Sequence, residues 1–131
     1  MESKNPGSKK SRPVYLDLRR IRLPVTGLVS ILHRISGVLL FASLPFVVYL
    51  FDLSLRSQQG FVQAAALLHH GFVKLWAFLL LWALLHHLVA GIRYLLIDFD
   101  IGVALPVARK SARVSIVGAL VLAVLLGAIL L

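Results

Sequence analysis

The residues best suited to chemistry lie in the segment HLVAGIRYLLID, which runs from His87 to Asp98. This segment closes a long apolar stretch, so His87 falls inside the predicted membrane and Asp98 near its boundary. Ionisable side chains are costly inside a bilayer, and we therefore treat His87 as a functional candidate. His87, Gly91, Tyr94 and Asp98 are spaced to share one face of a helix. Because Gly91 has no side chain, we expect a large, flat group to lie against this face, ligated by the imidazole of His87.

Neutral imidazole is a common axial ligand of haem iron. Hydrogen bonding of a histidine between membrane helices is also ordinary, and the pattern alone leaves both roles open. His86 points about 100° away from His87 on a helix, so at most one of them faces a given cofactor. His69 and His70 lie near a polar loop, roughly 27 Å along the helix axis, where solvated side chains are expected. A six-coordinate haem at His87 would therefore need its second ligand from a partner chain.

A second polar group opens the first apolar segment. Ser30 and Arg34 are four residues apart and share a helical face, with His33 beside them. A hydroxyl next to a guanidinium suits a quinone oxygen, and Arg34 with His33 suits haem propionates. The alternatives are an arginine that extends to the membrane surface and a serine near a helix start, and both are common.

The elements that must position these residues are transmembrane helices. The chain has 131 residues, of which 60% are hydrophobic, and its mean hydropathy is +0.92. Soluble domains are roughly 45–50% apolar, so the composition predicts an integral membrane protein. We predict an all-α fold with a basic arm over residues 1–29 and a membrane domain over residues 30–131. Its three helices are expected at about 30–51, 64–97 and 114–131, each long enough to cross a bilayer.

The charges predict the orientation and exclude some functions. The net charge of +9 comes from basic residues that flank the apolar segments, which is typical of cytoplasmic flanks and does not indicate nucleic-acid binding. We therefore predict a cytoplasmic N-terminus and a periplasmic C-terminus. The chain has no cysteine, so it cannot itself hold an iron–sulfur cluster. No nucleotide-binding fingerprint is present, and three helices are too few to enclose a large pore.

Three segments carry a family resemblance: RPVYLDL, then SILHRISGVLL, and later HLVAGIRYLLIDFD. Together they resemble the cytochrome b membrane-anchor subunit of succinate dehydrogenase, respiratory complex II. The resemblance covers nearly the whole chain. It implies a three-helix anchor that forms a helical bundle with a second anchor subunit in the membrane lipid. Haem b would be held between the two anchors, and a flavoprotein subunit and an iron–sulfur subunit would dock above them. Electrons from succinate, an intermediate of the tricarboxylic acid cycle, would reach ubiquinone at the membrane boundary.

The resemblance also implies roles for individual residues. His87 would be the axial ligand of the haem iron. His33 and Arg34 would lie beside the haem propionates. The residues implied for the ubiquinone site are Ser30, Ile31, Arg34 and Asp98. The chain alone would have no catalytic activity, because it would act only as a subunit of the quinone-reducing enzyme.

Two positions depart from the family pattern. Tyr94 stands where some relatives have histidine, and His86 is an unusual neighbour for the ligand. Two other functions stay open: a haem-free structural anchor or small transporter subunit, and the anchor of a fumarate reductase. The short chain without a convincing transit peptide favours a bacterial inner membrane.

Overall fold

The computed structural model describes residues 23–131, and most of the predicted arm therefore lies outside the described residues. Four helices make up this part of the chain: α1 (Val25–Arg56), α2 (Gln58–His69), α3 (Gly71–Asp98) and α4 (Leu105–Leu130). α1, α3 and α4 are long and apolar enough to cross a membrane. The prediction of an all-α fold with three membrane helices is confirmed.

The helices differ from the predicted ranges at their ends. α1 begins at Val25 rather than near residue 30, so the last five residues of the predicted arm are helical. α4 begins at Leu105, nine residues before the predicted start, with Pro106 in its first turn. The segment predicted as one helix over 64–97 is divided at His70, which has an extended backbone (φ −68°, ψ 130°). The first piece, α2, starts immediately after Ser57, whose Oγ accepts a hydrogen bond from the Gly60 amide at 3.0 Å.

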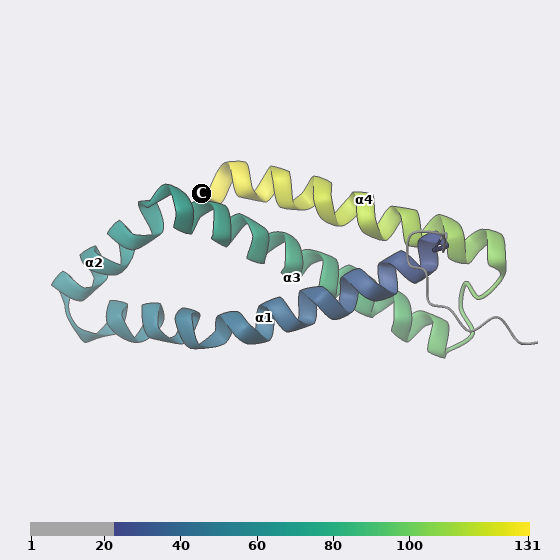
Figure 1. The fold of residues 1–131 in the computed structure, drawn as a ribbon, viewed down its shortest axis with the longest axis horizontal. Coiled ribbons are helices and arrows are strands. Elements are labelled where there is room, and N and C mark those ends of the chain that lie inside the picture. The colour runs from purple at the N-terminus through teal and green to yellow at the C-terminus, as the bar shows by residue number, and fades with distance from the viewer. Residues whose placement is uncertain (1–22) are drawn as a thin grey trace, which may run out of the picture.

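α3 is the centre of the bundle and packs against both α1 and α4. Figure 1 shows α1 beginning, α3 ending and α4 beginning at the same end of the bundle. We call this the basic end, because five of the seven described arginines and lysines lie toward it: Arg34, Arg93, Arg109, Lys110 and Arg113. Val29, Ala90 and Ala112, one from each long helix, form a small buried cluster there. α1, α3 and α4 therefore meet most closely where the candidate site lies.

Small residues let α4 lie close to α3. The residues of α4 that are buried are Ala112, Ser115, Ala119, Ala123 and Gly127. At Gly127 an added Cβ would stand only 2.8 Å from the ring of Phe78 on α3. Membrane helices commonly associate through such small residues, since van der Waals packing replaces the hydrophobic effect in lipid.

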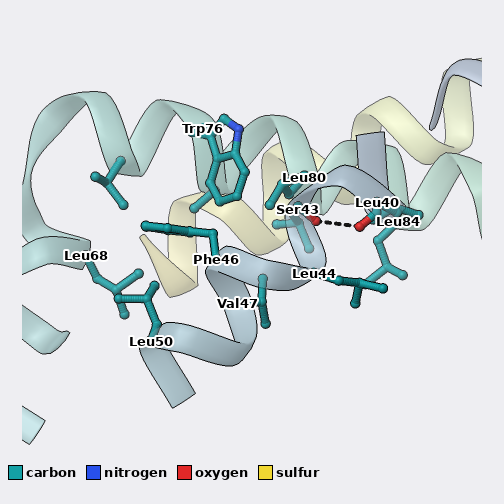
Figure 2. Close-up of a pocket in the computed structure, with 13 residues that line it drawn as sticks. Leu40, Ser43, Leu44, Phe46, Val47, Leu50, Leu68, Trp76, Leu80 and Leu84 are labelled. Atoms are coloured by element: carbon teal, nitrogen blue, oxygen red, sulfur yellow. Dashed lines mark hydrogen bonds between the residues drawn. The ribbon is translucent and has the colours of Figure 1, made fainter. Parts of the chain in front are cut away.

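At the opposite end, α1 diverges from α4, and α2 connects α1 to α3 across the gap (Figure 1). A groove of about 620 Å³ lies between α1 and α3 there, with apolar side chains along its walls (Figure 2). Phe46 and Trp76 face one another across it, with ring centroids 5.0 Å apart. Ser43 is one of the few polar residues in its wall, and its hydroxyl donates to the Leu40 carbonyl at 2.7 Å.

Gly60 allows α2 to pack closely against the last turns of α1. A Cβ at this position would lie 2.3 Å from the Leu53 carbonyl oxygen of α1, which is far closer than real contacts. We expect Gly60→Ala to lower the free energy of unfolding by about 1–3 kcal/mol, because overpacking forces the backbone to shift. Thermal unfolding of the purified complex would measure this, with Gly71→Ala as the control because nothing lies within 4 Å of that position. Equal midpoint temperatures for the two variants would contradict the prediction.

Candidate functional site

His87 lies on α3 and stacks directly on His33 of α1. Their ring centroids are 4.1 Å apart and the ring planes differ by only 12°. His33 lies over Gly91, where an added Cβ would stand 3.5 Å from Nε2 of His33, an ordinary van der Waals distance. The space that the sequence predicts for a flat group over Gly91 therefore holds the imidazole of His33. A further ligand would have to approach His87 from another side.

The hydrogen bonds of His87 leave one ring nitrogen available. Its Nδ1 lies 3.2 Å from the carbonyl oxygen of His33 and 3.2 Å from Oγ of Ser36. A carbonyl oxygen only accepts, so this bond requires the proton on Nδ1. Nε2 then carries the free lone pair and makes no hydrogen bond to any residue of the described chain. An imidazole held in this way is prepared to bind a metal ion through Nε2.

His86 is enclosed in the bundle, whereas the neighbouring His87 is partly accessible. His86 is fully buried, its ring stacks on Trp82 with centroids 5.6 Å apart, and neither ring nitrogen has a partner in the described structure. His87 is only partly buried. His69 and His70 are exposed at the opposite end of the bundle, as the sequence predicts. Of these four histidines, His87 alone combines access from outside the bundle with an oriented ring.

Ser30 and Arg34 lie side by side on α1, with Nη2 of Arg34 3.5 Å from Oγ of Ser30. The guanidinium of Arg34 is exposed, and so is the side chain of Ile31. Asp98 is exposed at the last position of α3, and no described hydrogen bond or ion pair joins it to Ser30 or Arg34. The structure thus brings together the serine and the arginine, while Asp98 has no described hydrogen bond or ion pair with either of them.

Ser30 also lines a cavity of about 440 Å³ at the basic end. The polar residues in its wall, besides Ser30, are Thr26, Arg93 and Tyr94. The first turns of α1, the end of α3, the loop that follows and the start of α4 border this hollow, which is open to the outside. This volume falls in the range of small-molecule sites. Thr26 was not singled out in the sequence, although it precedes Ser30 by one helical turn and could have been found from that spacing.

Arg93 is more buried than a residue at the membrane boundary should be. Only 7% of its surface is exposed. Its Nε donates to Oγ of Ser111 at 3.0 Å, and its Nη2 donates to the Ala108 carbonyl at 3.2 Å. The guanidinium also lies over the ring of Tyr94, 5.4 Å from its centroid. Arg93 therefore ties α3 to the first turns of α4 and holds one wall of the cavity.

Tyr94 lies on α3 and contacts His33 of α1. Its ring meets the ring of His33 edge-on, with centroids 5.4 Å apart. Its hydroxyl is buried without a described partner. Tyr94 therefore contacts His33 and also lines the cavity.

The described residues contain no group of three or more His, Cys, Asp or Glu side chains that could hold a metal ion.

Comparisons with known proteins give the family. Residues 8–126 match the family described as succinate dehydrogenase/fumarate reductase transmembrane subunit. The succinate dehydrogenase cytochrome b556 subunit of Coxiella burnetii is 39% identical over 117 residues, which cover 88% of this chain and 94% of the relative. The same subunit of Paracoccus denitrificans is 33% identical over 120 residues, covering 90% of this chain and 91% of the relative. With its three apolar helices, the chain is a multi-pass membrane protein and belongs to the succinate dehydrogenase/fumarate reductase transmembrane subunit family.

Proposed function

We propose that this chain anchors a succinate:ubiquinone oxidoreductase in the bacterial inner membrane, binds haem b with a second anchor subunit, and contributes to the site of ubiquinone reduction. The observation that carries the proposal is the imidazole of His87, whose Nδ1 is engaged and whose Nε2 is free. The name cytochrome b556 of both relatives supports a haem protein of the b type.

The residues present fit a haem group. His87 would ligate the iron through Nε2, since this nitrogen has no described partner and the ring is partly accessible. Haem, when bound, supplies one-electron redox chemistry. His86 is the poorer candidate because it is enclosed on all sides. Since His69 and His70 lie at the opposite end, the second axial ligand would come from the partner anchor.

His33 and Arg34 would bind the propionates. His33 stacks on His87, and Arg34 follows it on α1 with an exposed side chain. The exposed guanidinium of Arg34 can form charge-assisted, bidentate bonds with a carboxylate. A neutral imidazole of His33 would form a weaker bond with a propionate oxygen than the charged guanidinium of Arg34 does.

The ubiquinone site would be formed by Ser30, Ile31, Arg34 and Asp98. The adjacent hydroxyl and guanidinium can donate hydrogen bonds to a quinone oxygen, and Ile31 offers an apolar surface to the ring. The cavity lined by Ser30 supports this position, because it opens at the basic end where protons from water are available. Asp98 would supply protons from the exposed end of α3 rather than contact the quinone directly.

The basic end would face the cytoplasm, which places the N-terminus inside and the C-terminus in the periplasm. Arg109, Lys110 and Arg113 are exposed there and suit an acidic soluble partner. The iron–sulfur subunit would dock at this end and carry electrons from the flavoprotein subunit. The family description also includes fumarate reductase, so the reverse reaction is the second candidate function.

The decisive test is the reduced-minus-oxidised visible spectrum of the detergent-purified complex. We expect a b-type spectrum together with succinate-dependent reduction of a soluble ubiquinone analogue. A complex that contains no haem would refute the cytochrome proposal and favour the haem-free structural anchor. Faster quinol-dependent fumarate reduction than succinate oxidation would favour the reverse reaction.

A further inference from the structure

Two consecutive residues of α1, Ser36 and Gly37, lie against the imidazole of His87. Ser36 is fully buried, and its hydroxyl donates to the His33 carbonyl oxygen at 2.8 Å. With its proton committed to this carbonyl, Oγ can accept from Nδ1 of His87, 3.2 Å away. The Nδ1 proton therefore has two acceptors on α1, the Ser36 hydroxyl and the His33 carbonyl.

Gly37 sets how closely the ring can approach α1. A Cβ at this position would lie 3.1 Å from Cε1 and 3.5 Å from Nδ1 of His87. The first distance is tighter than ordinary van der Waals contact, so any side chain here would push the ring away from α1. The stacked ring of His33 covers one face of the same imidazole. The ring of His87 is thus limited by a steric contact, a stacking contact and two hydrogen bonds.

We propose that Ser36 and Gly37 are positioning residues that fix the tautomer and the orientation of His87 as a haem ligand. This inference rests on the proposed function, in which Nε2 of His87 binds the iron. Hydrogen bonds to the second nitrogen of a ligating histidine hold its ring plane and raise its basicity. A more basic ligand favours ferric over ferrous iron. Weakening the contacts of Ser36 and Gly37 with His87 should therefore raise the midpoint potential of the haem.

The test compares Gly37→Ala with Gly118→Ala in the purified complex. Both are glycine-to-alanine changes within a helix, but nothing lies within 4 Å of a Cβ at Gly118. In Gly37→Ala we expect retained haem, a higher midpoint potential and a changed EPR signal of the ferric haem, because both Nδ1 bonds lengthen. Gly118→Ala should match the wild type in both readouts. Wild-type potential and EPR signal in Gly37→Ala would overturn the role of Gly37.

Ser36→Ala gives a second measurement if Gly37→Ala does not assemble. Its matched control is Ser43→Ala, because Ser43 is also buried on α1 and donates to the carbonyl three residues earlier. Only Ser36 contacts the imidazole. We expect a smaller rise in midpoint potential for Ser36→Ala and none for Ser43→Ala, while equal potentials would overturn the role of Ser36.

The outcomes of these experiments distinguish the proposed function from the positioning role of Ser36 and Gly37. A wild-type complex without haem, or one that keeps a normal haem after loss of His87, would refute the proposed function and this inference with it. A haem that depends on His87 but is indifferent to Gly37→Ala and Ser36→Ala would refute only the positioning role.

Discussion

Replacing His87 with alanine is expected to abolish the b-type spectrum of the purified complex. The variant loses Nε2 of His87, which makes no described hydrogen bond and belongs to a ring that is oriented through its other nitrogen. A haem that is held by a single remaining ligand from the partner should dissociate during purification. The measurement is the haem content per complex, from the pyridine haemochrome, beside an immunoblot of the anchor subunits.

Two matched variants make this result specific. His69→Ala changes an exposed histidine at the opposite end and should keep full haem content. His86→Leu removes the buried neighbouring ring, which we do not assign to the iron, and any assembled complex should keep its haem. Loss of haem in His86→Leu with normal haem in His87→Ala would exchange the roles of the two histidines.

His87→Gly should regain a b-type spectrum when free imidazole is added, because imidazole can occupy the space of the lost ring.

Replacing Arg34 with alanine is expected to lower ubiquinone reduction by about tenfold to a hundredfold. Hydrogen bonds from a charged donor contribute roughly 1.5–3 kcal/mol, which corresponds to that range of rates. Succinate oxidation with an artificial soluble acceptor should not change, since that reaction does not use the membrane site. Ser30→Ala should show the same pattern with a smaller loss, because a neutral hydroxyl forms a weaker bond.

Arg56→Ala is the control for the loss of one positive charge. Arg56 is exposed at the opposite end of α1 and forms an ion pair with Asp52 within the same helix. Its removal should leave both activities unchanged, because exposed pairs of this kind contribute little to stability. If Arg34→Ala reduced both activities equally, the defect would lie in assembly and the assignment to the quinone site would be wrong.

Hydropathy predicts the membrane helices but not their ends. The apolar pattern continues through Ala64–Leu68 and on from Phe72, so nothing in the composition marks the break at His70. Hydropathy also places the start of α4 nine residues too late, because charged residues lie in its first turns. Its first turns carry Arg109 and Lys110, which are compatible with a helix but not with the bilayer interior. Hydropathy reports where a helix meets lipid, whereas hydrogen bonds in the backbone decide where it begins.

Within the candidate site, residue types and spacing predict which side chains share a helical face. They correctly place Ser30 beside Arg34, since this contact depends only on the period of α1. The stack of His33 on His87 could not be predicted, because it depends on how α1 and α3 are rotated toward each other. The contacts of Ser36 and Gly37 with His87 depend on the same rotation, so they could not be predicted from the sequence either.

The divergence of α1 from α4 has a mechanical consequence. The three long helices meet at the basic end and α1 separates from α4 toward α2, so the anchor is a wedge whose wide end contains the apolar groove of Figure 2. At the wide end α4 still packs on α3 through Gly127 and Phe78, whereas the groove separates much of α1 from α3. Delipidation should therefore loosen α1 from α3 at the wide end first, while the stack of His33 on His87 persists longer.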